Sequence, residues 1–277
     1  SGIGIANAEF TVKYYSNYDA SGTPERTWVL RTDDRGFTRL SNKYKVSGDD
    51  FYTLEGVVTL PLGTVTIQET KAPEGYLINE EVFVRQITSD GPAEQVTTYN
   101  APTIPETPQV IQIELYKVDS ETNKAEAQGT GSLAGAEYNV VDADNKVVDT
   151  LVTDEKGYAI SKELPLGVYT VKETAASNGY LVDAVAHTVD GSKPQDDTSR
   201  VFKYKVTSGE DVIRGDVEII KFYENIDEDN DTLQGIEGVE FTFTSKTTGK
   251  VAKKIITDKT GFATTASADQ PRGSLVF

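Results

Sequence analysis

Two segments of the chain, residues 69–76 and 173–180, share the pattern E-T-x-A-x-x-G-Y, and each begins eight residues after the proline of a P-L-G sequence. One structural unit therefore occurs at least twice. Apolar and polar residues alternate in the run that leads into each glutamate, so each carboxyl has the parity of the inward-facing side chains of a strand. A buried carboxylate is costly unless it is paired or protonated. The repeated glutamate therefore needs a partner.

A second motif, T-D-x-x-G-[FY], occurs three times, at residues 32–37, 153–158 and 257–262. It has the chemistry of a hairpin turn, with Asp as a cap, Gly for a positive φ and an aromatic residue to start the next strand. Upstream of each copy lies a segment that alternates as a half-buried strand does. The motif spacing indicates about 100 to 120 residues per repeat, which is the size of a small β-sandwich.

The second and third repeats open on a further strand pattern, at residues 111–117 and 217–221. By parity, Lys117 and Lys221 share a face with the apolar residues of these strands. A lysine is almost never fully buried without a partner. The inward-facing glutamate of the repeat is the obvious partner.

Together these segments resemble the Cna B-type, or SpaA-like pilin, domains of Gram-positive surface proteins. The resemblance covers nearly the whole chain and is most specific at residues 69–76. It implies an all-β fold of tandem Cna B-type β-sandwich domains, which are prealbumin-like and Ig-like. We expect a domain at 1–108 that lacks its first strand, a domain at 109–214, and the N-terminal half of a third, truncated copy at 215–277. The chain is then a segment of a longer protein.

The resemblance also implies an autocatalytic isopeptide bond in each domain. The bond would join the lysine of the first strand to an Asn or Asp on the last strand, and the glutamate of the motif would promote it. Burial favours a neutral amine and a neutral carboxylic acid, so the amine can attack the side-chain carbonyl while the glutamate relays protons. The alternative is a buried Lys–Glu ion pair with no bond.

In the first domain this mapping makes Glu69 the promoter and Asn100 the acceptor, whereas the lysine would lie upstream of residue 1. Asn100 shares the parity of the apolar side chains on a strand that ends at a proline-rich segment, so it takes the acceptor position.

In the middle domain Lys117 and Glu173 are present, but Ser208 occupies the acceptor position of the last strand. Serine cannot form the amide. Asp211 would serve as the acceptor if a bulge shifted the register of the strand, and the alternative is that no bond forms. The third copy supplies Lys221 without a promoter or an acceptor.

Composition narrows the classes of partner and site. The 277 residues contain no cysteine, which excludes disulfides and thiolate chemistry. The net charge of −17 argues against nucleic acid as a partner. No apolar run is long enough to span a membrane in this segment. We expect no metal and no cofactor.

The sequence favours a structural stalk or shaft segment of an extracellular, secreted protein that is attached to the Gram-positive cell wall as a surface or pilus-like protein. It is not an enzyme, apart from single-turnover formation of its own isopeptide bonds. The alternative is a cell-adhesion protein that binds a host matrix protein or a glycan, for which an aromatic cluster around Trp28, Tyr14, Tyr15 and Tyr18 is the first candidate surface. Covalent or head-to-tail self-association is a further partner class.

Overall fold

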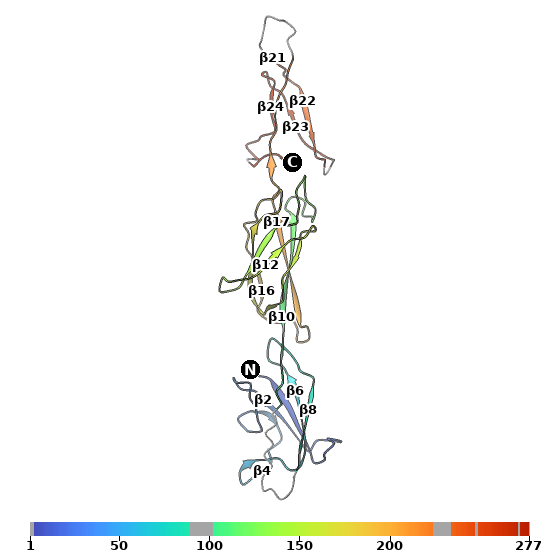
Figure 1. The fold of residues 1–277 in the computed structure, drawn as a ribbon, viewed down its shortest axis with the longest axis vertical. Coiled ribbons are helices and arrows are strands. Elements are labelled where there is room, and N and C mark those ends of the chain that lie inside the picture. The colour runs from blue at the N-terminus through green and yellow to red at the C-terminus, as the bar shows by residue number, and fades with distance from the viewer. Residues whose placement is uncertain (1–2, 89–101, 224–233, 247–248, 271, 277) are drawn as a thin grey trace. The chain divides into compact units, whose positions relative to one another are not determined.

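The structure is a computed structural model that describes residues 3–88, 102–223, 234–246, 249–270 and 272–276. Every regular element in these residues is a β-strand, as the all-β prediction requires. The chain divides into two compact units, one made of residues 1–111 and 192–202 and the other of residues 112–191 and 203–277. Figure 1 labels the strands, and each unit is described by itself below. The domain boundaries expected from the sequence remain a prediction.

The first unit contains a five-stranded antiparallel sheet in the order β3-β2-β1-β6-β8. Two short pairings, β4 with β5 and β7 with β9, accompany it. Its strands are β1 (Glu9–Tyr15), β2 (Arg26–Arg31), β3 (Lys45–Gly48), β4 (Thr53–Leu54), β5 (Val57–Val58), β6 (Gly63–Lys71), β7 (Tyr76–Leu77), β8 (Val82–Ile87) and β9 (Thr107–Pro108).

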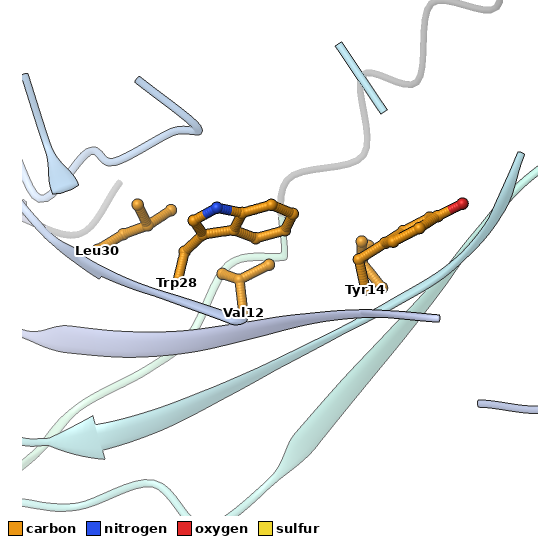
Figure 2. Packing of buried hydrophobic residues seen from close by; sticks show 5 residues of the cluster. Val12, Tyr14, Trp28 and Leu30 are labelled. Carbon is orange, nitrogen blue, oxygen red and sulfur yellow. The ribbon is translucent and has the colours of Figure 1, made fainter. Parts of the chain in front are cut away.

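The core of the first unit lies on one face of this sheet. Val12 and Tyr14 from β1 pack there with Trp28 and Leu30 from β2, and Figure 2 shows all four side chains on the same side of the ribbon. Trp28 is fully buried. Residues two apart on a strand share a face, so the alternation of apolar residues in β1 and β2 produces this cluster.

The repeat that follows forms two sheets. In one, β10 pairs with β13, β14 and β17, and the other has the order β12-β11-β15-β16. Its strands are β10 (Val110–Asp119), β11 (Glu137–Val141), β12 (Val147–Val152), β13 (Tyr158–Ile160), β14 (Leu164–Pro165), β15 (Gly167–Ala175), β16 (His187–Gly191) and β17 (Val201–Glu210). Ile113 and Leu115 of β10 are fully buried, as are Val140 of β11 and Val171 of β15. The inner faces of a β-sandwich are filled in this way.

The third repeat consists of two-stranded pairings: β18 with β25, β19 with β24, β20 with β21, and β22 with β23. Its strands are β18 (Arg214–Gly215), β19 (Glu218–Ile220), β20 (Phe222–Tyr223), β21 (Gln234–Gly235), β22 (Glu240–Thr244), β23 (Val251–Ile256), β24 (Phe262–Thr264) and β25 (Leu275–Val276). Lys221 is exposed, and Val217 and Ile219, which share its parity, are only half-buried, so no second sheet covers this face in the described residues.

The three T-D-x-x-G turns have the predicted chemistry. In the middle repeat one carboxylate oxygen of Asp154 accepts hydrogen bonds from the backbone N–H groups of Lys156 and Tyr158. Asp33 and Asp258 make the equivalent pairs of bonds in the other two repeats. The turn glycine has a positive φ of 70° at Gly157. A side-chain cap and a left-handed glycine therefore define this turn.

The glycine of the turn also lies against the strand that carries the lysine. The N–H of Lys117 donates to the carbonyl oxygen of Gly157 at 2.7 Å, and the N–H of Lys221 donates to that of Gly261 at the same distance. A Cβ atom on Gly157 would lie 2.4 Å from the carbonyl oxygen of Lys117. The turn thus fixes the backbone of the lysine, and only a residue without a side chain fits there.

We expect Gly157→Ala to destabilise the middle repeat more than Gly135→Ala does. Gly135 also has a positive φ, of 85°, but nothing lies within 4 Å of the position that a Cβ atom would take there. Its replacement should cost about 1–2 kcal/mol from backbone strain alone, and overpacking against Lys117 should add about 1–3 kcal/mol at Gly157. Hydrogen-exchange mass spectrometry of β10 peptides at increasing urea concentration measures both. Equal effects would mean that the contact with Lys117 does not matter.

Candidate functional site

The candidate site surrounds the side chain of Lys117 inside the middle repeat. Its Nζ atom contacts Oε2 of Glu210 and lies 3.8 Å from Oε1 of Glu173, and the three side chains are completely excluded from solvent. The ring of Tyr180 lies against the amine, with its centroid 5.0 Å from Nζ. One amine is therefore enclosed by two carboxyls and an aromatic face.

Strand alternation brings these groups together. Lys117 is on β10, Glu173 on β15 in the other sheet, and Glu210 at the end of β17. Along β17 the side chains of Val206, Ser208 and Glu210 are all buried. The parity of the inward-facing residues thus continues through Glu210, which is the last residue of the strand.

Further polar side chains lie close to Glu210. The hydroxyl of Tyr138 donates to Oε1 of Glu210 at 2.5 Å and lies 3.1 Å from Oγ of Ser208. Ser208 donates to Oδ2 of Asp183 at 2.7 Å, and the same oxygen is 3.0 Å from Nε2 of His187. The side chain of His187 is 21% exposed, so this row of polar contacts extends from the buried carboxyl to a residue at the surface.

Burial changes the acid–base properties of the site. It lowers the pKa of Lys117 to about 8, although attraction to Glu173 and Asp183 opposes the shift. Burial also raises the pKa of Glu173 and that of the Tyr138 phenol. Removal from water disfavours the charged form of each group. The pKa shifts of Lys117 and Glu173 increase the fraction of neutral amine and of neutral acid, which are the forms that nucleophilic attack by the amine requires.

The structure places Asp211 and Lys221 away from the buried amine of Lys117. Asp211 does not face the amine: its side chain is 61% exposed, and it accepts a hydrogen bond of 2.6 Å from Ser120. The strand keeps its alternation up to Glu210, so Asp211 has the outward parity. Lys221 is exposed in the third repeat rather than buried. Asn100 lies outside the described residues.

Two residues of the site, Glu210 and Tyr138, were not predicted from the sequence. Glu210 has the same parity as Ser208, two residues further along, and this alternation was the signal that could have found it. Tyr138 belongs to the alternating segment upstream of the second T-D-x-x-G-[FY] turn, which the sequence indicates as a half-buried strand. Only the cross-strand geometry shows that its hydroxyl meets a carboxyl.

The first unit contains a related arrangement at Glu69. Its Oε2 atom accepts a hydrogen bond of 2.6 Å from the backbone N–H of Asn79, just as Oε2 of Glu173 accepts one from the N–H of Asp183. Oε1 of Glu69 and Oε2 of Glu106 are buried and have no hydrogen-bond partner in the described residues. Burial and the nearby charge of Glu69 raise the pKa of Glu106 to about 7.

The aromatic cluster expected as an adhesive surface is largely internal. Tyr14 is 2% exposed and Trp28 is completely buried. Trp28 stacks on Phe51, with 5.7 Å between ring centroids. Only Tyr18, at 50% exposure, presents a large part of its surface to solvent. These rings therefore build the core of the first unit rather than a binding patch.

The sequence profile of the SpaA prealbumin-like fold domain matches residues 1–102 and 112–205. The match covers well over half of the chain, which therefore belongs to this family of Gram-positive pilin and surface-protein domains. The family consists of structural domains rather than enzymes.

Two relatives illustrate the likeness. The chain is 35% identical over 78 residues to the trypsin-resistant surface T6 protein of Streptococcus pyogenes serotype M6, a match that covers 28% of this chain and 13% of that protein. Its fold is similar to that of the Bacillus anthracis TIE protein, with a TM-score of 0.58 and 23% identity over 94% of this chain and 40% of the TIE chain. The chain thus spans less than half the length of either relative.

Two kinds of feature are absent from the described residues. None of their elements is a helix that could cross a membrane. Within the same residues no group of three or more His, Cys, Asp or Glu side chains is arranged to hold a metal ion.

The raised pKa of Glu106 predicts that the first unit loses stability as the pH rises. The folded state retains the proton up to about pH 7, whereas the unfolded chain releases it near the ordinary pKa of 4.5. Unfolding free energy therefore falls between these two values and is highest below them. Because Glu106 is only partly buried, we expect the loss to be about 1–2 kcal/mol.

Urea titrations of the full chain at several pH values test this expectation. Trp28 is the single tryptophan of the sequence, so its fluorescence reports on the first unit. Glu106→Gln should remove the pH dependence in this range, whereas Glu74→Gln, at an exposed position of the same unit, should keep it. A slope that persists in Glu106→Gln would contradict the assignment.

Proposed function

We propose that the chain is a force-bearing stalk segment of a Gram-positive cell-surface or pilus-like protein, and that an internal isopeptide bond to Lys117 staples its middle domain. The observation that carries the proposal is the burial of Lys117 beside Glu173, with both side chains inaccessible to solvent. If the amine and the two carboxyls stay ionised, the free energy lost by removing their charges from water can exceed the attraction between them. Formation of an amide removes the charge of the amine.

The position of the lysine supports a mechanical role. Lys117 lies on β10, which opens the repeat, and β10 pairs with β17, which closes it. A bond between these two strands would carry tension directly from the start of the domain to its end. It would also close a loop of roughly 90 residues, which by analogy with a disulfide restricts the unfolded chain by about 4–5 kcal/mol. The chain has no cysteine for a disulfide.

The contacts around Lys117 assign roles for this reaction. The neutral amine attacks the side-chain carbonyl of the acceptor, and Glu173 takes a proton from the nitrogen and returns it to the leaving group. The backbone N–H of Asp183 holds Oε2 of Glu173, which leaves Oε1 directed at the amine. The domain reacts once, with itself, and no external substrate is involved.

Adhesion remains the alternative, with a host matrix protein or a glycan as the partner. No observation favours it over the stalk, because the aromatic residues that suggested it form the core of the first unit. Extracellular attachment to the cell wall and covalent or head-to-tail self-association are parts of the same proposal. The name of one relative, a surface protein of Streptococcus pyogenes, agrees with this setting.

Intact-mass measurement of the denatured full chain tests the bond. We expect the parent to be lighter than its sequence mass by one small leaving molecule, and Lys117→Arg to have the mass of its own sequence. Lys156→Arg, at an exposed position of the same domain, should retain the deficit. Loss of the bond should destabilise the domain by roughly 4–5 kcal/mol. A folded parent with the full sequence mass would show that Lys117 and Glu173 form a plain ion pair.

A further inference from the structure

The group in contact with the amine of Lys117 is the carboxyl of Glu210, which lies on the strand paired with that of the lysine. Glu210 is 1% exposed. Its Oε2 atom contacts Nζ of Lys117, and its Oε1 atom accepts the hydrogen bond from Tyr138. Asp211, the next residue, points to the surface. Of these two acidic neighbours, only Glu210 can meet the amine.

The charges of this cluster do not balance when every group is ionised. Nζ of Lys117, Oε1 of Glu173 and Oε2 of Glu210 have no hydrogen bond to any other described residue. One ammonium group cannot neutralise two buried carboxylates, and each unpaired buried charge is strongly unfavourable. Conversion of one amine and one carboxyl to an amide removes one positive and one negative charge. The remaining carboxyl, that of Glu173, is neutral when it holds a proton, and burial favours this form by raising its pKa.

The same position recurs in the first unit, as backbone pairing shows. Tyr76 of the E-T-x-A-x-x-G-Y motif pairs with Pro108, and Tyr180 of the second motif bridges to Val212. The hydrogen bond from the N–H of Gln109 to Gly75, at 2.8 Å, is likewise repeated by Ile213 and Gly179. These contacts align the two repeats without reference to side chains.

In this alignment Glu106 corresponds to Glu210, because each lies two residues before the partner of the motif tyrosine. Glu106 is the residue whose pKa is raised by burial and by Glu69. Both repeats therefore place a second glutamate beside the motif glutamate. A glutamate two residues before the partner of the motif tyrosine is therefore a feature that both repeats share.

We propose that Glu210 is the acceptor of the cross-link in the middle domain, so that the bond joins Nζ of Lys117 to Cδ of Glu210. This inference rests on the proposed function and replaces Asp211 as the acceptor. The neutral amine adds to Cδ of the protonated Glu210 carboxyl group. The nitrogen then loses a proton to the departing hydroxyl, which leaves as water, and an amide remains. One amine and one carboxylic acid give one amide and one water, and no other reactant is needed.

Two neighbours act on this reaction directly. The Tyr138 hydroxyl donates to Oε1 of Glu210, which polarises the carboxyl and stabilises the oxygen as negative charge develops on it. Glu173, 3.8 Å from the amine through Oε1, carries the proton from the nitrogen to the departing oxygen. Tyr138→Phe keeps the ring and removes the donor, so we expect bond formation to slow by about 10²-fold or more.

The test compares the acceptor candidates in the full chain. The parent should weigh one water less than its sequence, and peptide mapping should find the Lys117 peptide joined to the peptide that contains Glu210. Glu210→Ala should have its full sequence mass. Glu210→Gln, which keeps the shape of the side chain, should lose ammonia instead of water. Asp211→Ala changes only an exposed side chain and should retain the water loss.

Each result separates this inference from the general proposal. A branched peptide that joins Lys117 to Asp211 or Glu173, or the loss of the deficit in Asp211→Ala, would overturn Glu210 as the acceptor and leave the stapled domain standing. A parent chain at its full sequence mass would overturn both. For Tyr138→Phe, the fraction of cross-linked chain is followed over time after cell-free synthesis, and a rate equal to that of the parent would remove Tyr138 from the mechanism.

Discussion

A lysine amine that is completely removed from water is the constraint on which the middle domain depends. Lys117 is tolerated there only because carboxyls from two other strands approach it. Its burial disfavours the charged amine and lowers its pKa to about 8. An apolar side chain at this position would fill the core equally well. The proposed cross-link therefore accounts for a lysine at this position, whereas the stability of the core does not require one.

The repeated T-D-x-x-G motifs position the strand that carries the lysine. The Asp and Gly of T-D-x-x-G shape a turn whose glycine hydrogen-bonds to the lysine backbone. The Thr has a separate role: Thr153 accepts a hydrogen bond from the N–H of Ala136 and donates to the carbonyl of Leu133. Thr32 and Thr257 repeat this pair of bonds. The turn thus connects the strand of the lysine to the segment that precedes the next strand.

Sequence periodicity was sufficient to predict the fold class and the contact between the side chains of Lys117 and Glu173. The parity of a strand determines which face each residue occupies. From the periodicity we did not identify Glu210, which we propose as the acceptor. From the resemblance we expected an Asn at the acceptor position, where the chain has Ser208, and we named Asp211 as the alternative acceptor. Glu210, not Asp211, has the inward parity of the strand. Lys221 has the parity expected of the lysine but is exposed, because alternation gives a side chain a face and does not provide a second sheet to cover it; its role in a cross-link stays a prediction. Asn100 lies outside the described residues, and its role as an acceptor stays a prediction.

The two glutamate sites show how one scaffold reaches opposite electrostatic states. In the middle domain an amine lies between the two carboxyls, and the cluster can lose charge through a bond. In the first unit no described residue forms an ion pair with Glu69, and the neighbouring Glu106 holds its proton up to about pH 7. The second glutamate of this pair can neutralise itself only by protonation. An amine placed between Glu69 and Glu106 would reverse the pH dependence of the first unit, because it would stabilise the carboxylate that burial now opposes. We infer that the group beside the second glutamate, rather than the fold, determines how the charge of the buried glutamate pair is neutralised. The means are protonation, an ion pair or a covalent bond.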